Sequence, residues 1–169
     1  MSDFNLDLVR PLCAALYAGD VDAVKRHLQL HPALKDYCNI DTPSLISTAA
    51  YCGNLEMVKM LVELGIDMNN VGMDGNATAL NSAVSFAPIA VTRYLLEKGA
   101  DPNVGRALFS AISRENEDEG LELVKLLIEH GADKNRVFHV YDDERLPAET
   151  PLTFAERQGK QKSPSTSAP

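Results

Sequence analysis

The stretch LLEKGADPN at residues 95–103 decides the fold, because two close copies of it occur elsewhere in the chain. The copies are LVELGIDMN at 61–69 and LLIEHGADKN at 126–135. In each one an apolar helical pattern ends at a glycine, which adopts positive φ at little cost and therefore ends helices. These three glycines are Gly65, Gly99 and Gly131. The chain thus contains a repeated helical unit.

A second, shorter segment rich in small residues lies upstream of each copy. These segments are SLISTAAYCG (44–53), TALNSAVSFA (78–87) and RALFSAISRE (106–115), with outlying versions RPLCAALYAG (10–19) and TPLTFAERQG (150–159). The five starts, at residues 10, 44, 78, 106 and 150, are 34, 34, 28 and 44 residues apart. A Ser or Thr cap followed by an apolar helix fits the starts at residues 44, 78 and 150. Each unit therefore predicts two helices, and such short pairs bury enough apolar surface only by stacking.

This pattern resembles the ankyrin repeat, which has a period of about 33 residues and a Thr-Pro-Leu-His-x-Ala motif. Thr150-Pro151-Leu152 keeps the motif most closely, and Thr78-Ala79-Leu80-Asn81 comes next. The resemblance implies an all-α solenoid of about four helix-turn-helix repeats plus a C-terminal half repeat. We expect one domain over residues 1–160, and the low-complexity residues 161–169 predict a disordered tail.

Composition narrows the possible partners. Sixteen Lys and Arg residues against 24 Asp and Glu residues give a formal net charge of −8, with a sequence pI near 4.9. This balance disfavours nucleic acid, which usually requires a basic patch, and favours a basic protein partner. We expect neither a membrane span nor a signal peptide. The odd number of cysteines, three, fits reduced thiols in a cytoplasmic protein.

Catalysis has little support in the sequence. A glycine-rich phosphate loop, a Gly-x-Ser-x-Gly elbow and a His-Glu-x-x-His motif are all missing from the chain. His27 and His31 are four residues apart, as two metal ligands on one helix face would be. Cys38 is close to them in the sequence, but one thiol in an expected loop does not complete a site. We therefore expect no enzyme activity, no cofactor and no metal, and a metal-dependent role is the weaker alternative.

The resemblance places two positions of each repeat on the concave, partner-binding surface. They follow the small residues of the first helix and are Tyr17 and Ala18, Tyr51 and Cys52, Ser85 and Phe86, and Ser113 and Arg114. Three of the four pairs contain an aromatic residue, and Tyr and Arg are typical interface anchors. The alternative is that these rings pack between neighbouring repeats.

Two acidic runs interrupt the repeat spacing. RENEDEG (114–120) adds four residues to the fourth repeat, and RVFHVYDDERLPAE (136–149) lengthens the connection before Thr150. We interpret both as loops and predict that Glu117, Asp118, Asp142 and Asp143 attract a basic partner, since insertions in repeat arrays tend to fall on one face. The alternative is that they are only solvated loops.

Together these observations predict a monomeric, non-catalytic protein-binding module that inhibits or neutralises its partner. The resemblance includes small bacterial ankyrin proteins, some of which look like immunity proteins encoded beside toxins. Both the small size and the acidity of this chain fit such a role. An adaptor or a regulatory inhibitor of eukaryotic type is the alternative.

Overall fold

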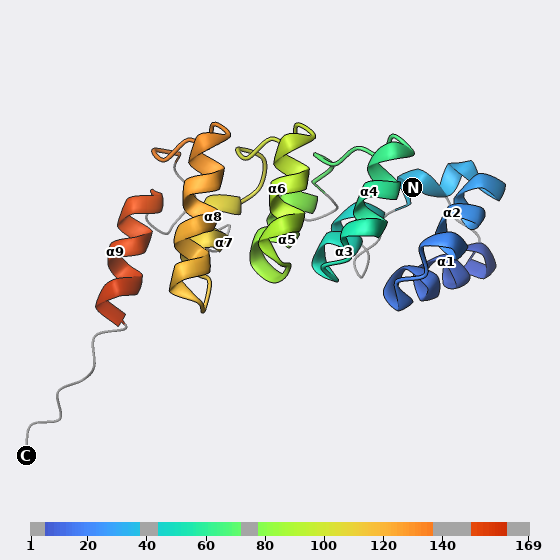
Figure 1. Cartoon of the computed structure of the whole chain (residues 1–169), viewed down its shortest axis with the longest axis horizontal. Coiled ribbons are helices and arrows are strands. Elements are labelled where there is room, and N and C mark those ends of the chain that lie inside the picture. The colour runs from blue at the N-terminus through green and yellow to red at the C-terminus, as the bar shows by residue number, and fades with distance from the viewer. Residues whose placement is uncertain (1–5, 38–43, 72–77, 137–149, 162–169) are drawn as a thin grey trace, which may run out of the picture.

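The computed structural model describes residues 6–37, 44–71, 78–136 and 150–161 (Figure 1). Helices alone make up the regular structure of these ranges, which confirms the predicted all-α solenoid. The elements are α1 (Leu6–Ala18), α2 (Val21–Leu30), the 3-10 helix η1 (Pro32–Asp36), α3 (Leu45–Tyr51), α4 (Leu55–Glu63), α5 (Ala79–Phe86), α6 (Ile89–Glu97), α7 (Ala107–Ile112), α8 (Glu117–Glu129) and α9 (Pro151–Gln161). The predicted tail lies outside the described residues apart from position 161, which ends α9.

The helices form two rows of stacked elements. Consecutive helices pair as α1 with α2, α3 with α4, α5 with α6, and α7 with α8. One row contains α1, α3, α5 and α7, each packed on the next, and α9 extends it by packing on α7. The other row contains α2, α4, α6 and α8. Figure 1 shows the pairs following one another along the molecule, as a solenoid requires.

Polar side chains begin most of the helices, as the sequence predicts. The Ser44 hydroxyl accepts a hydrogen bond from the Ser47 backbone N–H at 3.1 Å, and Thr78 accepts one from Asn81 at 3.0 Å. These bonds satisfy backbone donors that have no partner inside the helix. α6 and α7 begin without a side-chain cap hydrogen bond. α1 begins four residues before the predicted start at residue 10. Val9 is buried there and lengthens its apolar face.

The Gly-x-Asp-x-Asn endings connect one repeat to the next. Gly65, Gly99 and Gly131 have φ values of 76°, 92° and 92°, which confirms their predicted role in ending the helices. The Asn69 side chain accepts a hydrogen bond from the Asp101 N–H at 2.9 Å. One repeat later, Asn103 accepts one from the Asp133 N–H at 2.8 Å. The asparagine of each ending therefore holds the backbone of the following one.

The hydrophobic core lies between the two rows. Leu61, Leu95 and Leu127 occupy equivalent positions of α4, α6 and α8, and all three are fully buried. Ile128, the neighbour of Leu127 in α8, is 40% exposed. The next repeat contributes only α9 to the described residues, so α8 has no described outer helix beyond it to cover Ile128. Burial of this kind is the main source of stability in stacked repeats.

Candidate protein-binding surface

Three aromatic side chains project at the ends of consecutive first-row helices. Tyr17 and Tyr51 are each 53% exposed, and Phe86 is 63% exposed. The Tyr51 and Phe86 rings contact each other, with centroids 4.7 Å apart and planes inclined by 60°. Tilted ring pairs at such a separation are favourable. We call these three residues the aromatic stripe. The rings pack partly on one another, as the alternative interpretation held, yet more than half of each remains accessible.

The small polar residues beside the aromatic stripe differ in accessibility. Cys52 and Ser113 are exposed at the ends of α3 and α7, whereas Ser85 is half-buried in α5. Desolvation by neighbouring groups raises the pKa of the Cys52 thiol. A raised pKa disfavours the thiolate, which is the nucleophilic form. The fraction of Cys52 present as thiolate is therefore lower than that of an ordinary cysteine at the same pH.

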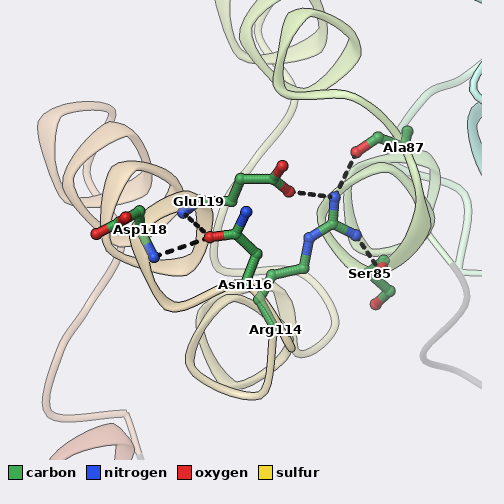
Figure 2. Close-up of polar contacts among 6 residues, drawn as sticks. All are labelled: Ser85, Ala87, Arg114, Asn116, Asp118 and Glu119. Atoms are coloured by element: carbon green, nitrogen blue, oxygen red, sulfur yellow. Dashed lines mark hydrogen bonds and ion pairs between the residues drawn. The ribbon is translucent and has the colours of Figure 1, made fainter.

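Arg114, predicted as a binding residue, connects two repeats (Figure 2). Its guanidinium group donates hydrogen bonds to the backbone carbonyl oxygens of Ser85 and Ala87, the latter at 2.8 Å. It also forms an ion pair with Glu119 at 3.3 Å. The planar arginine fork can serve several acceptors at once. These contacts give Arg114 a structural role, which sequence reasoning did not foresee.

The acidic run that we interpreted as a loop is helical from Glu117 onward, which corrects that interpretation. α8 has 13 residues, whereas α4 and α6 have nine each. Asn116 caps the added turn by accepting hydrogen bonds from the N–H groups of Asp118 and Glu119 (Figure 2). Carboxylates are favourable at a helix N-terminus, where the helix dipole is positive. The four extra residues therefore extend the helix.

We call residues 117–120 of α8 the acidic turn. Glu117 and Asp118 are exposed on it. Gly120 is buried and packs on α7, since a Cβ there would lie 2.8 Å from the Ala111 carbonyl oxygen. Glycine thus permits the close approach of the two helices. Asp142 and Asp143 lie outside the described residues.

A cleft of about 760 Å³ opens beside the acidic turn. Its aromatic residues are Phe86 of α5, Phe109 of α7 and Phe154 of α9. The Phe109 and Phe154 rings meet edge to face with centroids 5.2 Å apart, and both are largely buried. The remaining lining residues are polar: Ser85, Arg106, Ser110, Ser113, Arg114, Glu115, Asn116 and Glu119.

Sequence reasoning missed Phe109 and Phe154 as lining residues. A signal for Phe109 was present, because the equivalent positions of the three earlier repeats carry Cys13, Ser47 and Asn81. A bulky aromatic residue in place of a small or polar one indicates a local change in packing. The cleft joins the aromatic stripe through Phe86, which belongs to both.

Other candidate sites receive little support within the described ranges. Among the residues that the structure describes, no group of three or more His, Cys, Asp or Glu side chains is placed to hold a metal ion. The His27 ring nitrogen Nε2 lies 2.7 Å from the Leu8 carbonyl oxygen, so this ring ties α2 to α1. None of the described helices has the length and apolar character needed to cross a membrane.

Comparison with known proteins agrees with this architecture. A family model for ankyrin repeats, comprising three copies, matches residues 12–106. The chain belongs to the ankyrin-repeat family. Ankyrin repeats are protein–protein interaction modules and are generally non-catalytic, so the chain is assigned to that general class.

Several relatives contain similar repeats. A putative ankyrin repeat-containing protein of Treponema pallidum is 33% identical over 126 residues, covering 70% of this chain and 40% of the relative. A putative ankyrin repeat protein of fowlpox virus, FPV018, is 27% identical over 130 residues, covering 76% of this chain and 16% of the relative. Palmitoyltransferase AKR1 of Lachancea kluyveri is 32% identical over 92 residues, covering 53% of this chain but 12% of the enzyme. The chain thus spans less than half of each relative.

Proposed function

We propose that this ankyrin-repeat chain binds a basic protein through the aromatic stripe and the adjoining acidic turn, and inhibits or neutralises that protein. The observation that carries the proposal is the series of exposed rings, Tyr17, Tyr51 and Phe86, near the C-terminal ends of the first helices of three successive repeats. Neighbouring aromatic side chains supply large contact area at low entropic cost and are frequent interface anchors.

The charge of the chain supports a basic partner. The formal net charge is −8, and the exposed Glu117 and Asp118 lie on the acidic turn, one helix pair beyond Phe86. Opposite charge at the edge of an interface accelerates association and disfavours acidic competitors. A non-catalytic module acts on its partner by covering a surface of it, so inhibition is the proposed consequence. Neutralisation of a basic toxin by an immunity protein is one instance.

Capture followed by mutation tests the proposal. The immobilised chain is used to isolate its partner from cells that produce it, and the partner is identified by mass spectrometry. Affinity is then measured for wild type, Tyr51→Ala and Phe86→Ala. Each substitution is expected to weaken binding by about 1–3 kcal/mol, with little change in melting temperature. Leu30→Ala is the matched control, since Leu30 is 75% exposed but lies at the end of α2.

Two results would contradict the proposal. Unchanged affinity in both stripe variants would show that the aromatic stripe is not part of the interface. A lower melting temperature with unchanged affinity of the folded fraction would show that the rings stabilise the fold and do not bind the partner. Inhibition has its own readout, namely loss of the partner's activity at a one-to-one ratio with wild type but not with Phe86→Ala.

A further inference from the structure

The cleft next to the acidic turn has the size and lining of a recognition site. Its volume of about 760 Å³ lies within the range of about 300–1,000 Å³ that is typical of ligand-binding pockets. Phe109 and Phe154, largely buried against each other, line its floor with their accessible edges, and Phe86 contributes an exposed ring. Such a lining favours an aromatic or large aliphatic side chain as occupant.

The charges around the cleft favour a cationic occupant. Residues 115–122 contain five carboxylates, and the arginines nearby are Arg93, Arg106 and Arg114. Arg93 forms an ion pair with Glu122, and Arg114 is engaged by Glu119 and two carbonyl oxygens. Among the described residues Glu115 forms no ion pair, although it lines the cleft. The charged residues that line the cleft are balanced, with Arg106 and Arg114 against Glu115 and Glu119. The excess of negative charge comes from Glu117 and Asp118, which are exposed on the acidic turn beside it.

The shape of the surface favours an extended chain over a small molecule. Phe86 lines the cleft and also contacts Tyr51. A segment that fills the cleft can therefore continue along the aromatic stripe without leaving the first-row helices.

We infer that the cleft receives an extended segment of a basic partner protein. The segment inserts an aromatic or large aliphatic side chain among Phe86, Phe109 and Phe154, and it places a Lys or Arg beside Glu115 and the exposed carboxylates of the acidic turn. This inference rests on the proposed function and adds to it the chemistry of the partner's contact segment. The Arg114–Glu119 ion pair holds one wall of the cleft in place.

Selection from a random library of displayed twelve-residue peptides tests the inference without knowledge of the partner. Peptides enriched on the wild-type chain are expected to combine an aromatic or leucine residue with neighbouring Lys or Arg. Their affinity is then measured against Ser113→Trp, which fills the cleft from an exposed position, and against Glu115→Gln. We expect at least tenfold weaker binding to Ser113→Trp and roughly three- to tenfold weaker binding to Glu115→Gln.

Two matched substitutions on α8 control for bulk and charge alone. Lys125 and Glu129 are exposed and are not among the residues that line the cleft. Lys125→Trp and Glu129→Gln are expected to bind the selected peptides like wild type, and the melting temperatures of all four variants show that each is folded.

The inference is overturned if no peptide is enriched, if the enriched peptides are acidic, or if they bind Ser113→Trp as well as wild type. Self-association of the pure chain that Ser113→Trp abolishes would assign the cleft to a second copy and likewise overturn it. The affinity of the captured partner distinguishes failure of this inference from failure of the proposed function. If that partner binds Tyr51→Ala more weakly than wild type but binds Ser113→Trp as tightly as wild type, the aromatic stripe belongs to the interface and the cleft does not.

Discussion

The central repeats and the fourth repeat differ in how their two helices are joined and held against the neighbouring repeat. In the central pair, α4 and α6 begin soon after α3 and α5 end, and the turns approach closely. Gly53 has φ of 69°, and a Cβ there would lie 3.0 Å from Pro88. The fourth repeat instead has the acidic turn on α8, and Arg114 reaches back to the carbonyl groups of Ser85 and Ala87.

This difference shows how a repeat array acquires an individual site. The central repeats keep a short, uniform connection that favours close stacking. The four residues inserted in the fourth repeat form an additional helical turn, which projects Glu119 beside the cleft. A regular scaffold thus carries an irregular end, and three pairs of substitutions test how sharply the two regions differ.

The largest expected effect is in the central core. Leu95→Ala removes a fully buried side chain of α6 and should lower the free energy of unfolding by about 2–5 kcal/mol, measured by urea denaturation. Ile128→Ala, at a 40% exposed position of α8, should cost less than about 1 kcal/mol, because little apolar area is lost. Equal costs at the two positions would contradict the difference in packing between the regions.

The second largest effect on the free energy of unfolding is expected at two arginines, Arg114 and Arg93, that each form an ion pair with a glutamate of α8. Arg114 and Arg93 each lie 3.3 Å from a glutamate, but the Arg114 side chain is 15% exposed and that of Arg93 is 49% exposed. Arg114→Ala should therefore cost about 1–3 kcal/mol through lost charged hydrogen bonds, and Arg93→Ala no more than about 1 kcal/mol. Chemical denaturation of both variants measures this. If Arg93→Ala proves the more costly, Arg114 does not connect the repeats as described.

A smaller effect is expected at the contact between the acidic turn and α7. Gly120→Ala introduces a Cβ 2.8 Å from the Ala111 carbonyl oxygen. The resulting strain should outweigh the gain in helix propensity and leave a net cost of about 1–2 kcal/mol. Lys125→Ala, on the exposed side of the same helix, is the control and should stay within about 0.5 kcal/mol of wild type. A stabilised Gly120→Ala variant would show that the turn does not pack on α7.

Much of the fold was predictable because its signals are local. Ser44 and Thr78 cap helices, and Gly65, Gly99 and Gly131 end them, through backbone chemistry that depends on a few neighbouring residues. The spacing of these signals then indicated stacking. The helical form of residues 117–120 was missed because their charges suggested a loop, whereas Asn116 and the helix dipole favour carboxylates in a first turn.

The candidate site was less predictable because it depends on contacts between repeats. The register of the repeats indicated Tyr17, Tyr51 and Phe86 as one series. It did not indicate that Arg114 turns back to the preceding repeat, or that Phe109 meets Phe154 about 45 residues later in the chain. The ring contact depends on how α9 packs on α7, and the arginine contacts depend on how α7 packs on α5. No local pattern specifies either packing.

Hydrogen–deuterium exchange of the chain with and without its captured partner tests the central claim most directly. The claim is that the partner covers the aromatic stripe and the cleft of the fourth repeat. The account predicts slower exchange on binding in segments containing residues 51–53, 85–87 and 109–119, with α4 and α6 little changed. Protection confined to α4, α6 and the C-terminal half of α8 would place the partner on the other row of helices and contradict the account.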